Sequence, residues 1–345
     1  MQHQYKNSFS WKARWGMFVI VFVITLFQQI FAQPLVTGRT KFLGCATSSA
    51  IWLGPDSCWN QITPNNDGKW GSLTFMRGVY DWRSLDTIYN YAIQQGLQYK
   101  HHNLVWGNQQ PNWISTLDSA DQRMEVEKWI RLVGQRYPKM TFVDVVNEPL
   151  LNLKYHNAPP YKNALGGDGA TGWDWVITAF TWARQYCSIG VKLLLNEFNV
   201  LHDANATNRY IQLIDTLKNR GLIDGIGVQG HYFELRSQVS TGGYVYDIDT
   251  LKANLDRLTA TGLPIYISEF DIEEPDEATQ LAQYQIYFPL FWNHPGVKGI
   301  TLWGYIQNDV WDQHPNTYIF NADGTARLAA KWLREYVSNS NYRSH

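Results

Sequence analysis

The sequence has 345 residues, of which 45% are hydrophobic and 17% are charged. This composition supports a folded core and argues against a disordered chain. The formal net charge of −1 gives no indication of binding to nucleic acid or to an anionic membrane surface. The length fits one large domain or two ordinary ones.

The first 32 residues have the pattern of a signal peptide. Three basic residues precede the apolar run Met17–Phe27, and a candidate cleavage site follows at Ala32. The apolar run is short for a membrane span, although an uncleaved anchor is the alternative. We therefore expect residues 1–32 to be removed and residues 33–345 to form one secreted domain, extracellular or periplasmic. No stable membrane association is expected after processing.

Beyond residue 40, apolar runs typical of β-strands alternate with amphipathic patterns typical of helices. Leu85, Ile88, Tyr89 and Ala92 share one helical face, and the same spacing recurs from Val126 and from Tyr210. Eight runs have strand character: Lys41–Ala46, Ser72–Phe75, Leu97–His102, Phe142–Asn147, Lys192–Asn196, Gly225–Gln229, Pro264–Glu269 and Gly299–Trp303.

Such alternation favours an α/β fold with a parallel sheet, and eight units favour one closed (β/α)8 TIM barrel. A doubly wound open sheet is the alternative, but no GxGxxG loop follows the first strand.

The three cysteines are Cys45, Cys58 and Cys187. An odd number in an exported chain leaves at least one thiol unpaired, and Cys45 could pair with Cys58 across a loop. No CxxC pair or Cys/His cluster is present, so no metal site is expected.

Polar and aromatic side chains stand at the carboxyl ends of six predicted strands, which in a barrel form the catalytic face. In chain order they are His102, Asn147 with Glu148, Asn196 with Glu197, Gln229 with His231, Glu269 and Trp303. The presence of such residues at six strand ends is hard to explain as a coincidence of structure alone.

Two of these residues suit the cleavage of a glycosidic bond, which requires two carboxyl groups. Glu148 follows the fourth strand and Glu269 ends the seventh, so both side chains could face one cleft across the barrel mouth. We expect Glu148 to be the acid/base and Glu269 the nucleophile, with carboxyl groups about 5–5.5 Å apart for a retaining reaction. A strand-end salt bridge is the alternative for either residue alone.

Neighbouring polar residues are candidates for support of this pair. Asn147 could hold the 2-hydroxyl of a sugar, and Gln229 could bond to Glu148. His231, with Asp271 behind it, could orient Glu269, and Asn196 is a further supporting residue.

Several motifs in order resemble those of glycoside hydrolase family 10, from about Lys41 to Val337. Three segments resemble family motifs: Thr63–Trp70 resembles TPENxMKW, His102–Gln109 resembles HTLVWHSQ, and Leu194–Asn199 resembles LYINDYN. Three others match family motifs: Asp144–Pro149 matches DVVNE, Gly227–His231 matches GxQxH, and Trp303–Trp311 matches WGxxDxxSW.

The resemblance implies an endo-1,4-β-xylanase that hydrolyses xylan with retention of configuration and without a cofactor. It implies that five residues bind sugars on the non-reducing side of the cut: Asn66, Lys69, His102, Trp106 and Gln109. It also implies that Trp303 and Trp311 wall the sugar under attack and exclude the hydroxymethyl group that glucose carries and xylose lacks.

The sequence departs from the family pattern at four positions. Asn65 stands where the family usually has Glu, and Glu197 and Gln307 each stand where it has Asp. Gly107 stands where a second His is common, and we expect this change to leave space beside the cleft. Because both proposed catalytic carboxylates are kept, these departures bear on substrate preference rather than on reaction class.

Two other functions remain open at this stage. One is a β-1,4-glucanase, or a mixed xylanase and glucanase, on the same barrel. The other is a non-catalytic carbohydrate-binding barrel, which the retention of Glu148 and Glu269 disfavours. The chain is expected to act as a monomer.

Overall fold

Eight parallel strands close into a barrel in the order of the chain, from β1 to β8 and back to β1. The computed structural model describes residues 40–51, 59–151, 156–235 and 247–339. The strands are β1 Phe42–Thr47, β2 Gln61–Pro64, β3 Gln98–Val105, β4 Phe142–Asn147, β5 Lys192–Glu197, β6 Gly225–Val228, β7 Ile265–Phe270 and β8 Val297–Leu302. The predicted (β/α)8 barrel is confirmed.

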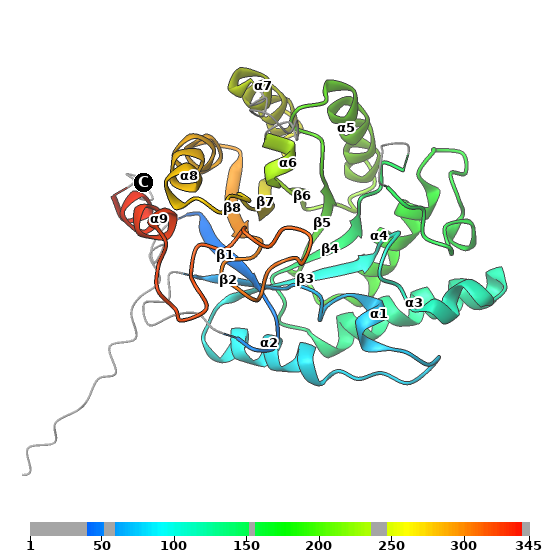
Figure 1. Ribbon diagram of the computed structural model, residues 1–345. Helices are drawn as coiled ribbons and strands as arrows, with labels where there is room; N and C mark the ends of the chain where they lie inside the picture. Colours follow the sequence, from blue (N-terminus) through cyan, green and yellow to red (C-terminus); the bar gives the residue numbers. More distant parts are fainter. Residues whose placement is uncertain (1–39, 52–58, 152–155, 236–246, 340–345) are drawn as a thin grey trace, which may run out of the picture. The chain divides into compact units, whose positions relative to one another are not determined.

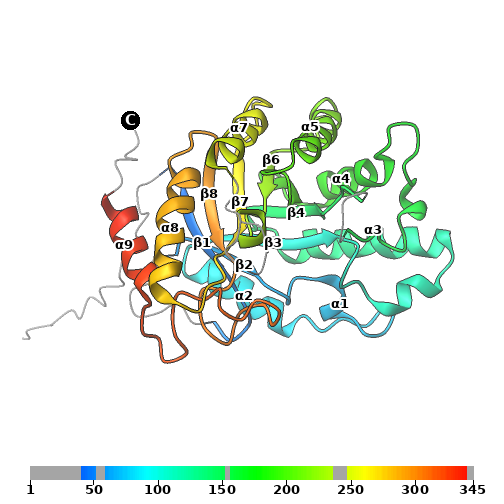
Figure 2. The same cartoon turned by 45° about the horizontal axis from the view of Figure 1, so that its top comes forward.

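Helices surround the strands (Figure 1), and Figure 2 shows the same arrangement in a turned view. They are α1 Trp70–Leu73, α2 Arg83–Gln94, α3 Ser119–Arg136, α4 Asp174–Tyr186, α5 Ala204–Lys218, α6 Tyr232–Leu235, α7 Ile248–Thr259, α8 Glu277–Trp292 and α9 Leu328–Asn339. Two short 3-10 turns lie at Asn112–Thr116 and Asn163–Leu165.

The three helical patterns in the sequence form the buried faces of α2, α3 and α5. Aspartate side chains cap the amino ends of four longer helices by accepting backbone N–H bonds, which satisfies donors that a helix leaves open. Gly96 follows α2 with a φ of 67°, a left-handed conformation that glycine adopts without steric cost.

The end of the barrel where the strands begin is filled by aromatic side chains. Phe42, Phe142 and Tyr266 form a small buried cluster with Leu194. The ring centroids of Phe142 and Tyr266 are 4.9 Å apart, and those of Phe42 and Tyr266 are 5.8 Å apart. This packed floor leaves the opposite end, where the strands finish, for polar side chains.

The prediction of a strand at Ser72–Phe75 is wrong. That stretch overlaps α1, and the second strand is Gln61–Pro64. This strand is only four residues long, contains polar Gln61 and Thr63, and ends in a proline that lacks an N–H for the ladder. Its apolar signal in the sequence is therefore weak.

The predicted leader, residues 1–32, and Cys58 lie outside the described residues. Cys45 is buried in β1. Within the described ranges, no helix combines the length and the apolar character that crossing a membrane requires.

Candidate active site

Glu148 stands just past the end of β4, where the chain turns sharply. Its φ is 54°, a left-handed conformation uncommon for a residue other than glycine, and its N–H donates to the carbonyl of Asn196 at 2.9 Å. Strained backbone of this kind is often found at functional sites. The turn directs the half-buried Glu148 side chain toward the residues that follow β3 and β6.

Three neutral donors hold the Glu148 carboxyl group. The Trp106 indole Nε1 donates to Oε2 at 2.8 Å. The Asn147 Nδ2 and the Gln229 Nε2 donate to Oε1 at 3.2 and 3.3 Å. The expected contact between Gln229 and Glu148 is present.

Glu269 lies on β7 and is buried. Its Oε1 accepts a hydrogen bond from Asn196 Nδ2 at 2.7 Å, and its Oε2 lies 3.3 Å from His231 Nε2. The other ring nitrogen of His231 is 2.7 Å from Asp271 Oδ2. The sequence-based grouping of Glu269, His231 and Asp271 therefore exists in space.

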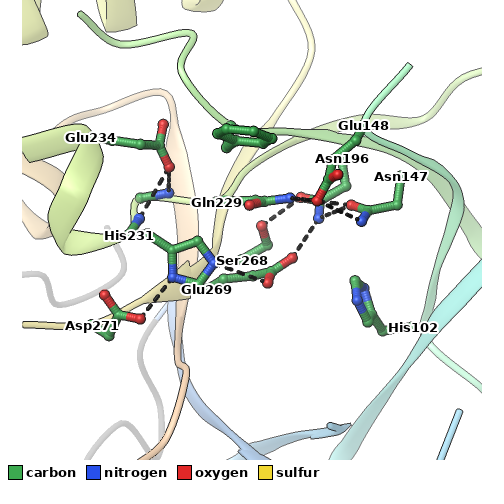
Figure 3. A network of polar contacts seen from close by, with 12 residues as sticks. His102, Asn147, Glu148, Asn196, Gln229, His231, Glu234, Ser268, Glu269 and Asp271 are labelled. Carbon is green, nitrogen blue, oxygen red and sulfur yellow. Dashed lines mark hydrogen bonds and ion pairs between the residues drawn. The ribbon is translucent and has the colours of Figure 1, made fainter. Parts of the chain in front are cut away.

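The two carboxyl groups belong to one hydrogen-bonded network (Figure 3). Asn196 Nδ2 donates both to Glu269 and, at 2.8 Å, to Asn147 Oδ1, and Asn147 in turn donates to Glu148. Ser268 Oγ donates to Asn196 Oδ1 at 2.5 Å and so fixes the orientation of the amide. Four neighbouring strands, β4 to β7, supply or directly precede the residues of this network.

The surroundings shift the pKa values of the two carboxyl groups in opposite directions. Burial, followed by the negative charge of Glu197, raises the pKa of Glu148 to about 7. Burial also acts to raise the pKa of Glu269, but the charges of His102, His231 and Lys100 and the hydrogen bond from His231 outweigh it and lower the pKa to about 2. Near neutral pH, one group can carry a proton while the other is ionised.

His231 is a positive partner that contacts Glu269 directly. Burial alone would lower its pKa, but the carboxylates of Asp271 and Glu269 raise it well above the ordinary value. With a carboxylate at each ring nitrogen, the ring donates in both directions.

His102 and Lys100 on β3 both contact the buried Asp144 of β4. His102 Nδ1 lies 2.9 Å and Lys100 Nζ 3.0 Å from Asp144 Oδ2. Trp303, which is buried just past β8, packs against the His102 ring in a T-shaped arrangement with a centroid distance of 5.1 Å. These contacts hold His102 rigidly at the end of the barrel interior.

Four predicted sugar-binding residues form a second group beside Glu148. Lys69 Nζ and Gln109 Nε2 both donate to Asn66 Oδ1, at 2.9 and 3.2 Å. The Lys69 ammonium lies 5.3 Å from the ring centroid of Trp106. Burial lowers the pKa of Lys69 to about 8, although the charges of Glu269 and Glu148 act against this change.

Trp311 lies on the loop after β8 and remains 40% exposed, so it is not a core residue. Its ring meets the His314 ring edge to face at 4.3 Å and lies 6.1 Å from the His231 ring. The structure therefore brings Trp311 to the side of the network that contains Glu269.

Some residues of the site were missed by reasoning from the sequence. They are Lys100, His156, Glu234 and Ser268, together with the roles of Asp144 and Glu197. The available signal was a charged residue inside an otherwise apolar strand, as at Asp144 in β4; the strand that carries Lys100 is largely polar and gives no such signal. No signal in the sequence links His156 to Glu197, because the contact joins the end of β5 to the separate segment that follows β4.

The expectation that Gly107 leaves space beside the cleft is wrong. A Cβ atom at this position would lie 1.5 Å from the backbone carbonyl oxygen of Asn157. The chain after β4 fills the space instead.

Among the residues that the structure describes, no group of three or more His, Cys, Asp or Glu side chains could hold a metal ion. The side chains of the network contact one another directly.

Several known proteins are similar to this chain. Endo-1,4-beta-xylanase B of Cellvibrio japonicus is 38% identical over 295 residues, which is 85% of this chain and 45% of that protein. Endo-1,4-beta-xylanase 2 of Aureobasidium pullulans is 28% identical over 83% of this chain and 78% of its own length. The chain thus spans less than half of the first relative and more than three quarters of the second.

Solved structures share the fold. The structure of GH10 from Paenibacillus barcinonensis has a TM-score of 0.75 and 22% identity, covering 91% of this chain and all of that one. Native xylanase 10B from Thermotoga maritima has a TM-score of 0.73 and 22% identity, covering 88% and 96%. Since the sequence model of glycosyl hydrolase family 10 matches residues 37–336, the chain belongs to that family.

Proposed function

We propose that this protein is a retaining endo-1,4-β-xylanase, with Glu148 as acid/base and Glu269 as nucleophile. The proposal is supported above all by one observation: two carboxyl groups in one hydrogen-bonded network have pKa values that their surroundings shift in opposite directions. A glycosidase needs one group that is protonated and one that is ionised at the same pH. Family membership and the names of the xylanase relatives support the choice of xylan.

In the first step, Glu148 gives its proton to the glycosidic oxygen as the bond to the anomeric carbon breaks. The Glu269 carboxylate attacks that carbon and forms a covalent glycosyl-enzyme. The bond pair leaves with the oxygen, which takes the proton, so the aglycone departs as a neutral alcohol. The raised pKa of Glu148 supports its role as the donor near neutral pH.

In the second step, Glu148 is ionised and acts as a base. It removes a proton from a water molecule, which attacks the anomeric carbon and releases Glu269 as a carboxylate. The low pKa of Glu269 suits it as a leaving group. Two inversions at one carbon give net retention.

The remaining site residues are proposed to bind and orient the sugars. Asn147 holds the 2-hydroxyl of the sugar under attack, and Asn66, Lys69 and Gln109 bind sugars further toward the non-reducing end. His102 and Trp106 bind sugars on the same side of the cut, and Trp106 contacts both Lys69 and Glu148. His231, Asp271 and Asn196 keep Glu269 ionised and oriented, and Gln229 orients Glu148.

Trp303 and Trp311 are proposed to form the wall that selects xylose over glucose. Trp303 is fixed by packing, whereas Trp311 presents an exposed indole. Aromatic side chains lose few rotamers when they hold a position, so they make an effective steric barrier.

We further propose that residues 1–32 are a signal peptide and that the secreted monomer, residues 33–345, consists of the catalytic barrel.

The activity itself is tested by release of reducing sugar from xylan, cellulose and mannan. Xylan should be preferred over cellulose by roughly 10–200-fold per discriminating subsite, because exclusion of a hydroxymethyl group is worth about 1–3 kcal/mol. Equal rates on xylan and cellulose would indicate a mixed enzyme, and no hydrolysis of any polymer would reject the proposal.

Substitution of the two carboxylates should separate their roles. Glu269→Ala should reduce activity by orders of magnitude, with partial recovery in added azide. Glu148→Ala should impair substrates with poor leaving groups far more than activated aryl xylosides, because only the former require a proton. Initial rates on both substrate types provide the measurement, and equal losses in Glu148→Ala would contradict the assignment.

The raised pKa of Glu148 also predicts a link between stability and pH. Protonated Glu148 is favoured in the folded state, and this contribution to stability is complete below the unfolded pKa of 4.5 and is lost as pH rises through about 7. Glu148→Gln removes the ionisable group. The Tm of this variant relative to that of the natural protein should therefore rise from pH 4 to pH 8. Melting curves at these pH values test this, and a constant difference in Tm would be the contrary result.

Trp311→Ala tests the proposed wall. A folded variant should lose proportionally more activity on xylan than on an aryl cellobioside, because the truncated side chain no longer excludes the hydroxymethyl group. Phe75→Ala, at an 89% exposed position, is the aromatic control and should change neither activity. An unchanged ratio of activities in folded Trp311→Ala would refute the wall.

Export is tested by amino-terminal sequencing of the protein from the culture medium or periplasm. The mature chain should begin near Gln33. Recovery of a membrane-bound form that retains Met17–Phe27 would show that the leader is an anchor.

A further inference from the structure

A buried pair, Glu197 and His156, lies behind the turn that carries Glu148. Glu197 ends β5, and its Oε2 accepts the N–H of Leu150 at 3.0 Å, two residues beyond Glu148. Its Oε1 accepts the N–H of Phe198 at 2.8 Å. The carboxylate therefore anchors the backbone that leaves Glu148.

His156 completes this anchor from the chain that follows β4. Its Nε2 lies 2.7 Å from Glu197 Oε1, and both side chains are fully shielded from solvent. The His156 ring stacks on Phe198 with a centroid distance of 4.5 Å and an interplanar angle of 8°. Shielding from water strengthens electrostatic interactions of such a pair with its neighbours.

Gly107 permits the chain to bring His156 to this position. Asn157, the next residue, places its carbonyl oxygen where a Cβ of residue 107 would be. Two further contacts fasten the segment: Asn157 Nδ2 donates to Asn108 Oδ1 at 2.7 Å, and Tyr161 OH donates to the Trp106 carbonyl at 3.3 Å. Any side chain at position 107 must displace Asn157 and with it His156.

We propose that His156 and Glu197 are positioning residues that set the proton affinity of Glu148, and that Gly107 is required for their contact. This inference rests on the proposed function of Glu148 as acid/base. The negative charge of Glu197 opposes ionisation of Glu148, and a proton shared with His156 reduces that effect.

Within the described part of the chain, the following charged and titratable groups bear on Glu148 and on the pair. Glu197 raises the pKa of Glu148 and His156 lowers it. Lys69, from the loop between β2 and α1, faces Glu148, and Tyr210 of α5 faces Glu197. Trp106 and Gln229 contact Glu148 as neutral donors. Removal of Glu197 or of His156 should therefore change the affinity of Glu148 for its proton in opposite directions.

The test measures kcat/KM against pH for an aryl xylobioside with a poor leaving group, using the mature chain. The alkaline limb of this profile reports the acid of the free enzyme. Glu197→Gln should move the limb to lower pH, and His156→Gln should move it to higher pH, each by on the order of one pH unit. Gly107→Ala should resemble His156→Gln, and the double variant should add little to either change.

His294→Gln is the matched control. Like His156, His294 contacts a carboxylate, that of Asp256 at 2.9 Å, but His294 precedes β8 at the opposite end of the barrel. The His294→Gln variant should leave the alkaline limb of the pH profile unchanged. Circular dichroism should confirm that each variant is folded.

Two results would overturn the proposal: an unchanged limb in folded Glu197→Gln and Gly107→Ala, or shifts of the same sign in Glu197→Gln and His156→Gln. A loss of kcat/KM that is uniform across pH would assign the pair a structural role only. If the natural protein does not hydrolyse xylan, the proposed function fails instead.

Discussion

The arrangement of the site depends on the hydrogen bonds of the Asn196 side-chain amide. One nitrogen donates to Glu269 and to Asn147, and Ser268 holds the amide oxygen. Because Asn147 contacts Glu148, the orientation of this amide relates the two carboxyl groups to each other. The barrel makes the arrangement possible, since neighbouring parallel strands end at the same face and Asn147 pairs directly with Asn196 between β4 and β5.

The same face concentrates buried charge, which has a cost in stability. Lys100, His102 and His231 surround Glu269, whereas Glu148 is held by neutral donors and lies near the negative Glu197. A buried charge is tolerated where opposite charges and hydrogen bonds satisfy it. The division of charge thus fits a site in which one carboxyl group is kept ionised and the other keeps its proton, at the expense of the folded state at alkaline pH.

The sequence was sufficient to predict the barrel and to mark the central residues of the candidate site, because both predictions depend on local patterns. Seven of the eight predicted strands agree with the structure, and Asn147, Glu148 and Glu269 are marked by their position after apolar runs. The second strand was missed because Gln61–Pro64 is short and half polar. The close approach of Asn157 to Gly107 and the contact of His156 with Glu197 could not be predicted. Both depend on how the segment after β4 packs against the loop after β3 and the end of β5.

The central claim is that Glu269 is the residue that forms the covalent intermediate. The most direct measurement is mass spectrometry of the protein after reaction with a 2-fluoro xylobioside that carries a good leaving group, because the fluorine slows breakdown of the intermediate. We expect one added 2-deoxy-2-fluoro-xylobiosyl group, located on the peptide that contains Glu269. A label on Glu148, or rapid turnover with no covalent adduct, would contradict it.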